Sequence, residues 1–349
     1  MSSLRPVRGT AREILALLRE WETAADPEPL VIATSGSTGA PKRVALSRAA
    51  MRASALATID RLGGPGHWVL NLPPTYVAGV QVLFRSVVCG TSPVLFEESF
   101  MRTAEQLHGR GFVSLVPTQL VRLLDDPDET AALAAYTTVL VGGGPLDPMV
   151  RARAEAAGVS VVQTYGMSET CGGCVYDGVP LAGVDVRIDD GHVLLRGPML
   201  FDGYEGEPER TAAALRDGWL VTNDLGRLDG SGRLRIDGRA DDVVITGGVK
   251  VPAGVVARRL EQDPDIAEAF VLGVPDREWG QRVVAVVVRR DRPLDAAEVT
   301  SRRGESDLST DWPPGWKPKQ VIGVDRLPLL ANGKVDRQAL LAMVLEGSP

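Results

Sequence analysis

One segment near the N-terminus, Thr34-Ser-Gly-Ser-Thr-Gly-Ala-Pro-Lys42, constrains this chain more than any other. It follows the apolar run Leu30–Ala33, which predicts that it leaves the end of a β-strand. Gly36 and Gly39 allow the backbone to turn its N–H groups inward, and a lysine supplies positive charge for phosphate oxygens. Further hydroxyl donors come from Ser35, Ser37 and Thr38. This composition is typical of a phosphate-binding loop, and a flexible linker of the same composition is the alternative.

The segment differs from the P-loop of nucleoside triphosphatases. Pro41 precedes Lys42 and Arg43 follows it, whereas the P-loop has Gly before its lysine and Ser or Thr after it. A hydroxyl that binds magnesium must therefore come from a position other than the one directly after the lysine.

Composition excludes several classes of protein. With 349 residues the chain is long enough for two cores, and its 44% apolar and 24% charged residues are those of a globular protein. The net charge of −7 and the lack of a Lys/Arg cluster argue against a nucleic-acid surface. Apolar runs are too short to span a bilayer, and the N-terminus lacks the apolar block of a signal peptide. We therefore expect a cytoplasmic protein without nucleic-acid partners or membrane insertion.

Short β-rich runs alternate with helical patterns from Leu30 to about Gln163, which predicts a parallel α/β sheet. The expected strands are Leu30–Ala33, Trp68–Leu72, Pro93–Phe96, Phe112–Val116, Thr138–Val141 and Ser160–Gln163. Ligand-binding loops of such sheets gather at the carboxyl ends of the strands. The phosphate-binding loop, a triple glycine at Gly142–Gly144 and the segment Tyr165–Glu169 are expected to meet there.

Beyond Val175 the pattern changes to short strands with frequent Gly and Asp, which predicts a small β layer. We expect a large N-terminal domain over residues 1–238, with a doubly wound, mostly parallel sheet and this β layer. A small, mobile α+β C-terminal domain is expected over residues 239–349, with a hinge near Asp241.

Six segments occur in the order that is found in the adenylate-forming family of acyl- and aryl-CoA ligases, nonribosomal adenylation domains and luciferases. The chain therefore resembles this family over nearly its whole length. The segments are Thr34–Lys42, Gly142-Gly-Gly-Pro-Leu146, Gln163-Thr-Tyr-Gly-Met-Ser-Glu-Thr170, Gly218-Trp-Leu-Val-Thr-Asn-Asp224, Gly238–Lys250 and Pro328-Leu-Leu-Ala-Asn-Gly-Lys334.

The resemblance implies an ATP site. Glu169 is similar to the family's magnesium-binding glutamate, assisted by a loop hydroxyl such as Thr38, and a glutamate that caps a turn is the alternative. Tyr165 resembles the ring that packs on adenine, Asp224 the aspartate that binds the ribose hydroxyls, and Arg239 a contact to the nucleotide. The other ATP-binding positions implied are Thr34, Ser35, Gly36, Ser37, Gly39, Lys42, Gly142, Gly143, Gly144, Pro145, Gly166, Met167 and Ser168.

The resemblance also implies a two-step cycle with CoA as co-substrate. Lys334 is similar to the family's catalytic lysine, whose role toward the carboxylate and the α-phosphate is electrostatic, beside Glu169 and Lys42. Rotation about Asp241 then brings Thr246, Gly247 and Gly248 to the thiol channel.

Within this family the chain resembles the short actinobacterial form of the o-succinylbenzoate–CoA ligases, which act in menaquinone biosynthesis. The expected acid pocket contains Tyr76, Gly79, Gln81, Arg85, Thr164 and Thr170. Arg85 lies nine positions after Tyr76, which stands where the family usually has histidine. An arginine suits a second carboxylate on the substrate, and a residue on the surface of a helix is the alternative. Only 33 residues precede the phosphate-binding loop, so we expect most of the family's first subdomain to be missing.

Other functions remain open at this stage. They are another aryl- or acyl-CoA ligase of the benzoate type, an adenylation domain that loads a carrier protein, and a nucleotide sensor without catalysis. Apolar surface near residues 80–100 predicts a possible homodimer. Cys171 and Cys174 have the spacing of a metal or redox motif but lack a second pair, so small side chains in a pocket wall are the preferred interpretation.

Overall fold

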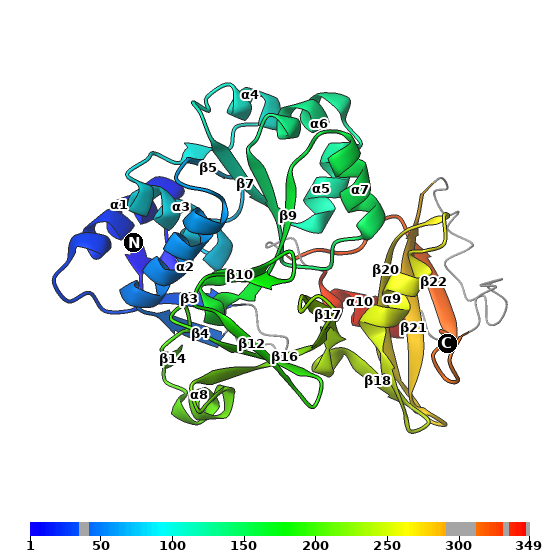
Figure 1. Cartoon of the computed structure of the whole chain (residues 1–349). Coiled ribbons are helices and arrows are strands. Elements are labelled where there is room, and N and C mark those ends of the chain that lie inside the picture. Colours follow the sequence, from blue (N-terminus) through cyan, green and yellow to red (C-terminus); the bar gives the residue numbers. More distant parts are fainter. Residues whose placement is uncertain (35–41, 291–311, 331–334, 347–349) are drawn as a thin grey trace.

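A seven-stranded sheet lies at the centre of the computed structural model, which describes residues 1–34, 42–290, 312–330 and 335–346 (Figure 1). The strands are β5 (His67–Leu70), β6 (Val94–Leu95), β7 (Gly111–Leu115), β8 (Thr138–Val141), β9 (Val161–Met167), β10 (Gly172–Tyr176) and β11 (Val179–Pro180). Their order is β11-β10-β9-β8-β7-β5-β6. The strands from β6 to β9 pair in parallel, whereas β10 and β11 add antiparallel at one edge.

Helices cover both faces of this sheet, which confirms the doubly wound α/β prediction. Along β5, Trp68 and Leu70 face one core while Val69 faces the other, as the period of two in a strand requires. One face is covered by α1 (Ala11–Thr23), α2 (Arg48–Arg61) and α3 (Val77–Cys89). The other is covered by α4 (Phe100–Ala104), α5 (Pro117–Leu124), α6 (Pro127–Ala134) and α7 (Pro148–Ala156).

The first predicted strand belongs to a different sheet, so its assignment to the parallel sheet is wrong. β3 (Leu30–Thr34) pairs antiparallel with β4 (Lys42–Leu46), which in turn pairs with β14 (Gly203–Tyr204). Thr34 lies opposite Lys42 in this ladder. The predicted phosphate-binding segment therefore connects two antiparallel strands rather than a strand and a helix of the parallel sheet.

A second β layer follows the large sheet, as the sequence predicts. It consists of β12 (Asp185–Asp189), β13 (His192–Arg196), β15 (Leu215–Arg216), β16 (Trp219–Leu228) and β17 (Leu234–Arg239), with α8 (Pro208–Ala214) before β15. Val193, Leu195 and Leu220 point from this layer into the core beneath α1 to α3. This layer therefore shares a hydrophobic core with the large sheet and with α1 to α3.

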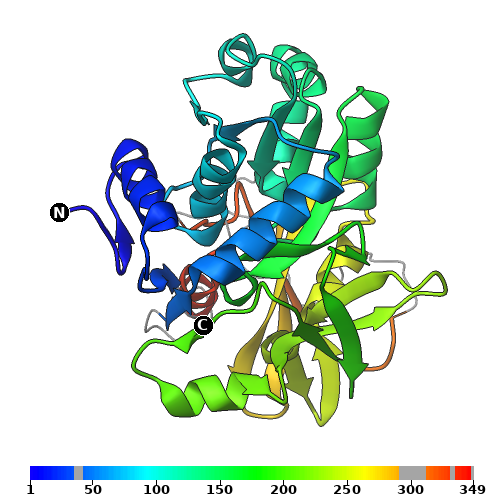
Figure 2. The ribbon, with the colours of Figure 1, turned by 60° about the vertical axis from the view of Figure 1, so that its left-hand side comes forward.

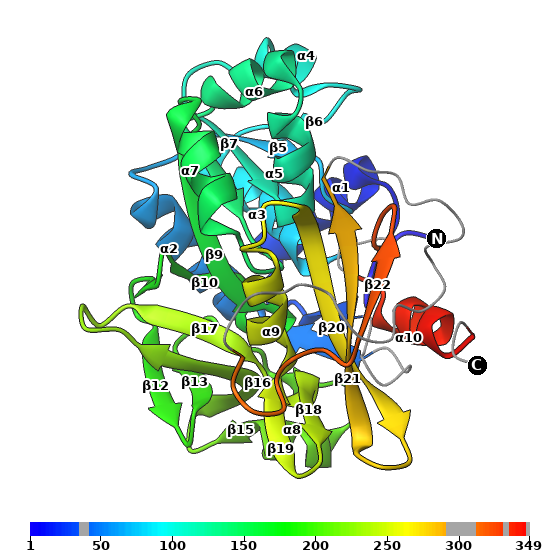
Figure 3. The same cartoon turned by 90° about the vertical axis from the view of Figure 1, so that its right-hand side faces the viewer.

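The C-terminal part has a sheet of its own (Figure 3). Two hydrophobic cores pack against this sheet. After a 3-10 turn, η2 (Ala240–Asp242), come β18 (Val243–Thr246), β19 (Val249–Pro252), α9 (Ala253–Leu260), β20 (Ile266–Asp276), β21 (Gly280–Arg289), β22 (Gln320–Val324) and α10 (Arg337–Glu346). Val256 of α9 and Leu340 of α10 lie in different cores, on opposite faces of the β20–β21 pair. The division near residue 239 and the mobility of this part stay predictions.

The N-terminal elements pack around α3 (Figure 2). A hairpin of β1 (Ser3–Leu4) and β2 (Val7–Arg8) leads into α1, whose first turn is closed by a capping box between Thr10 and Glu13. α3 contacts α1, α2 and β5, so residues 79–86 are buried. The expected exposed apolar surface is therefore wrong for this stretch, although Phe96 and Met101 beyond it are exposed. Within the described ranges, no helix combines the length and apolar character needed to cross a membrane.

Candidate active site

Tyr165 and Asp224 meet where β9 approaches β16. The Tyr165 hydroxyl donates to Asp224 Oδ2 at 2.7 Å. Asp224 is only 7% exposed, and its backbone N–H donates to the Thr222 hydroxyl at 3.0 Å. Burial, followed by the nearby Asp224 charge, raises the pKa of Tyr165. The phenol therefore stays neutral and remains a donor to the carboxylate.

Arg239 holds Asp224 from the other side. Its Nη1 donates to Asp224 Oδ1 at 3.2 Å, while Nε and Nη2 donate to the two Asp241 oxygens at 2.8 and 3.0 Å. Hydrogen bonding to Asp241 raises the arginine's pKa further. The guanidinium is thus engaged by two carboxylates, whereas the sequence predicted a contact to the nucleotide. Each Asp224 oxygen has a second lone pair that can still accept a ribose hydroxyl.

The glycines beside Tyr165 allow backbones to approach closely. A Cβ on Gly142, just after β8, would lie 2.3 Å from Thr164 Oγ1, and one on Gly166 would lie 2.1 Å from the Gly172 carbonyl oxygen. Gly143 has φ +83°, which favours glycine. Gly144 and Pro145 continue this loop toward α7, and Met167 ends β9. The structure therefore brings the triple glycine and the Tyr165 segment together as predicted.

Glu169 lies in a 3-10 turn, η1 (Ser168–Thr170), directly after β9. Its carboxylate accepts a hydrogen bond from the Tyr204 hydroxyl, with Oε1 2.8 Å from the phenol oxygen. The ring of Tyr204 also lies 5.6 Å from Lys42 Nζ, so the glutamate and the lysine predicted for the metal and phosphates share one neighbour. Sequence reasoning missed Tyr204, for which the signal was an aromatic residue after the turn pair Asp202-Gly203.

The residues around Glu169 fit a magnesium ion bound together with phosphates. Among the described residues, no three His, Cys, Asp or Glu side chains form a metal-binding group. Mg²⁺ usually takes one or two carboxylates and completes its shell with phosphate oxygens and water, so one half-buried glutamate suffices. The expected hydroxyl partner, Thr38, lies outside the described residues.

Two residues of the expected acid pocket form side-chain hydrogen bonds with backbone groups. Gln81 is 1% exposed and its Nε2 donates to the Cys171 carbonyl at 2.8 Å, while its Oε1 has no partner among the described residues. The Thr170 hydroxyl donates to the Gly172 carbonyl at 2.7 Å and accepts the Met167 N–H at 2.9 Å. Both therefore shape the turn after Glu169, and Gln81 retains one free acceptor.

The remaining pocket residues line the start of α3 and its neighbour β9. Tyr76 is the half-buried N-cap residue of α3 and makes no capping hydrogen bond with its side chain. A Cβ on Gly79 would lie 2.2 Å from the Pro73 carbonyl oxygen, so only glycine allows the loop before α3 to fold against it. The Thr164 hydroxyl donates to the Val141 carbonyl at 3.4 Å.

Arg85 is buried in α3, and the alternative of a residue on the helix surface is wrong. Its side chain is 4% exposed and its Cζ lies 4.6 Å from the centre of the Trp68 ring. Among the described residues, Nε has no hydrogen-bond partner and no carboxylate forms an ion pair with the guanidinium. Burial lowers the pKa of Arg85, because the charged form loses its hydration. The guanidinium is therefore a desolvated cation without an anionic partner among the described residues.

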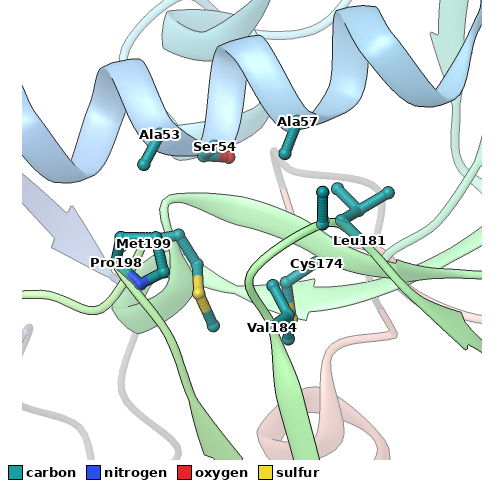
Figure 4. Close-up of a pocket in the computed structure, with 10 residues that line it drawn as sticks. Ala53, Ser54, Ala57, Cys174, Leu181, Val184, Pro198 and Met199 are labelled. Carbon is teal, nitrogen blue, oxygen red and sulfur yellow. The ribbon is translucent and has the colours of Figure 1, made fainter.

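A small cavity lies between α2, β10 and the chain segments before β12 and after β13 (Figure 4). Its volume of about 10 Å³ holds no more than a single water. Ser54, Cys174 and Met199 are among the side chains that line it, so Cys174 does stand in a cavity wall. Burial raises the pKa of both Cys171 and Cys174. Neither thiol therefore has the reactive character of a redox pair.

The residues expected to line the thiol channel form a tight hairpin in the C-terminal sheet. Gly247 and Gly248 have φ values of +54° and +79°, which match a two-residue turn between β18 and β19. The Gly247 N–H donates to the Trp279 carbonyl at 2.9 Å, and Thr246 is 3% exposed. The hairpin is part of the C-terminal sheet, since Thr246 pairs with Gly280 of β21 and Gly247 packs against Trp279.

Arg337 connects the end of the chain to the expected hinge. Its guanidinium donates to the Asp241 carbonyl at 3.3 Å and forms an ion pair with Asp242. It lies three positions after Lys334. Six of the predicted site residues, Ser35, Gly36, Ser37, Thr38, Gly39 and Lys334, lie outside the described residues.

Several features of the chain are those of an enzyme that binds an adenylate. They are a buried carboxylate held by a tyrosine and an arginine, a glutamate in the turn after β9, and a connection between β3 and β4 whose sequence is typical of a phosphate-binding loop. The chain belongs to the family of AMP-binding enzymes. The family model described as AMP-binding enzyme matches residues 16–205, and that of the AMP-binding enzyme C-terminal domain matches residues 256–334.

Relatives with named activities show which AMP-binding enzymes this chain is similar to. A probable 2-succinylbenzoate–CoA ligase of Mycobacterium tuberculosis is 42% identical over 340 residues, which are 94% of this chain and 88% of that protein. The o-succinylbenzoate CoA synthetase of Bacillus subtilis in complex with the acyl-adenylate intermediate OSB-AMP is 29% identical, with a TM-score of 0.76 over 89% of this chain and 68% of that one. The same synthetase with ATP and magnesium ion is 28% identical, with a TM-score of 0.74 over 89% and 69% of the two chains.

Proposed function

We propose that the protein is an AMP-forming acid–thiol ligase that activates o-succinylbenzoate with ATP and then transfers the acyl group to CoA. The named relatives support this reaction, since they are ligases for the same acid. The AMP-binding family and the synthetase complex with ATP and magnesium support ATP and Mg²⁺ as its co-substrate and cofactor.

In the first step, a carboxylate oxygen of the acid attacks the α-phosphorus of ATP, and the bond to the β-phosphate breaks to release pyrophosphate. Tyr165 would pack on adenine, and Asp224 would accept the ribose hydroxyls. Lys42 and Lys334 would supply positive charge where negative charge accumulates in the transition state. Glu169 would hold the magnesium ion, which would supply positive charge against the triphosphate.

In the second step, the CoA thiolate attacks the acyl carbon and AMP leaves with the electron pair of the mixed anhydride bond. We place this step after a rotation of the C-terminal domain about Asp241, which would bring the hairpin at Gly247 and Gly248 to the acyl-adenylate. Glycines there leave room for the thin pantetheine arm.

The observation that carries the choice of acid is Arg85, which is buried and has no ionic partner among the described residues. An isolated buried charge is costly unless it is paired and hydrogen-bonded. o-Succinylbenzoate has two carboxylates, so one can react with ATP while the other pairs with the guanidinium in a bidentate manner. A monocarboxylic aryl acid would leave the cation unpaired.

A measurement of pyrophosphate release across a panel of aryl acids tests this proposal. We expect release with o-succinylbenzoate, formation of its CoA thioester when CoA is added, and little reaction with benzoate. Lys334→Ala serves as the matched control, because it should lose adenylate formation but still convert synthetic acyl-adenylate to the thioester. Equal turnover of benzoate and o-succinylbenzoate, or no pyrophosphate release with any acid, would contradict the proposal.

A further inference from the structure

We infer that Tyr204 is a positioning residue that fixes the Glu169 carboxylate for the metal–nucleotide complex and ties it to the strand that begins at Lys42. This inference rests on the proposed function, because it takes Glu169 to be the metal ligand. Tyr204 belongs to none of the motifs that indicated the family.

The main chain and the side chain of Glu169 are held by one short segment. Glu169 lies in a turn of three residues, which by itself does little to restrain a side chain. The Phe201 N–H donates to the Glu169 carbonyl at 2.9 Å, and the Tyr204 hydroxyl donates to Oε1 at 2.8 Å. The rings of Phe201 and Tyr204 pack edge to face with centres 5.0 Å apart. The phenol is therefore a fixed donor.

The same segment is fastened to β4, the strand that leaves the phosphate-binding loop. Tyr204 pairs with Val44 in the β14–β4 ladder, two positions after Lys42. The Glu205 N–H donates to the Arg43 carbonyl at 2.8 Å, and the Glu205 carboxylate forms ion pairs with Arg43 and Arg5. A displacement of β14 would therefore move the support of Glu169 relative to the end of the loop.

Charge and exposure make Tyr204 suited to this role. Its side chain is buried, and its hydroxyl lies within hydrogen-bond distance of the Glu169 carboxylate. The hydroxyl occupies Oε1, and within the described ranges no hydrogen bond to Oε2 is found, which leaves that oxygen for a cation. Arg210 and Lys42 lie 5.2 and 5.6 Å from the ring centre, so a phenylalanine would keep these contacts.

Tyr204→Phe removes the donor and keeps the ring. A hydrogen bond to a charged group contributes enough that we expect the affinity for metal in the presence of ATP to fall roughly tenfold or more. Tyr136→Phe is the matched control, because it deletes a buried hydroxyl that has no partner among the described residues and lies in the core on the opposite face of the sheet. It should bind metal like the unmodified protein.

The experiment is a titration of the full chain with Mn²⁺ in the presence of ATP and the absence of any acid, followed by electron paramagnetic resonance of the bound ion. Support requires a weakened Mn²⁺ site in Tyr204→Phe, an unchanged site in Tyr136→Phe and no further weakening when Tyr204→Phe is added to Glu169→Gln. Equal Mn²⁺ affinity in Tyr204→Phe and the unmodified protein overturns the inference. So does additive weakening in the double variant, or a lack of Mn²⁺ binding by the unmodified protein.

The thermal midpoints of both phenylalanine variants separate positioning from stability. A weakened Mn²⁺ site in Tyr204→Phe at an unchanged midpoint supports positioning, whereas weakening that follows a lowered midpoint overturns it. Because no acid is present, failure of this test is distinct from failure of the proposed ligase reaction, which pyrophosphate release would report.

Discussion

Replacement of Arg85 by methionine separates recognition of the acid from stability of the fold. Methionine fills a similar volume and keeps an apolar stem against Trp68, but it removes the charge. Because Arg85 is only 4% exposed, its guanidinium has already lost its hydration before the acid arrives. Its pairing with a carboxylate therefore avoids most of the usual desolvation cost. Two hydrogen bonds between charged groups then stabilise the complex by about 3 kcal/mol, or roughly 100-fold in kcat/KM.

The assay is steady-state pyrophosphate release with the acid and ATP varied in turn. We expect Arg85→Met to lower kcat/KM for o-succinylbenzoate by roughly 100-fold while the KM for ATP stays within about twofold. Residual turnover of benzoate should not fall, because a monocarboxylate makes no use of the arginine. A loss of similar size for ATP or for benzoate would refute the assignment of Arg85 to the acid pocket.

In the protein without ligand, Arg85→Met should increase the stability of the fold. Loss of the cation–π contact with Trp68 costs about 2 kcal/mol, whereas an unpaired buried charge carries a penalty of several kcal/mol. The second effect is larger, so Arg85→Met should raise the thermal midpoint of the free protein. A lowered midpoint would show that the guanidinium has a partner within the fold and would remove the argument for a dicarboxylic acid.

Three further predictions concern other parts of the molecule. Asp224→Asn should raise the KM for ATP about tenfold and leave that for the acid unchanged, because the ribose loses a charged acceptor; an ATP titration that shows no change would contradict this. Gly166→Ala should lower the free energy of unfolding by about 2 kcal/mol or more, since its Cβ would lie 2.1 Å from the Gly172 carbonyl oxygen. Gly144→Ala, whose Cβ would be 3.7 Å from Pro117, is the control in the same urea titration, and equal losses would count against the packing argument. Burial raises the pKa of Glu261 from 4.5 to about 7, so the folded state binds this proton more tightly and stability falls as the pH rises from about 4.5 to 7. Glu261→Gln should therefore be more stable than the unmodified protein at pH 8 and similar to it near pH 5, and a constant difference across urea titrations at both pH values would exclude this cause.

Local structure was predictable where short apolar runs are bounded by turn residues. The strand at Thr138–Val141 was predicted with the bounds that the structure has, and the strand predicted over Phe112–Val116 occupies Gly111–Leu115. Each of these signals depends on residues that are neighbours in the chain. The alternation of β and α segments likewise predicted the doubly wound sheet.

Pairing between distant segments was harder to predict. The run Leu30–Ala33 reads as a strand in either kind of sheet, and its true partner, β4, begins within the segment that we interpreted as a loop. Nothing in the local sequence around Arg239 indicated that this residue would form ion pairs with both Asp224 and Asp241. Tyr204 was missed because its role depends on contact with Glu169, 35 positions earlier in the chain. The two residue types suggest nothing when they are read separately.

The Arg239 fork has a mechanical consequence for the connection between the two parts of the molecule. Its Nη1 donates to Asp224, the residue that we propose binds the ribose, and its Nε and Nη2 donate to Asp241 in the turn η2 before β18. If the C-terminal part rotates about Asp241 as proposed, the turn η2 would be displaced. Arg239 would then either lose its contacts to Asp241 or displace Asp224. Under the proposed function, nucleotide binding at Asp224 would be coupled to this rotation through the Arg239 side chain.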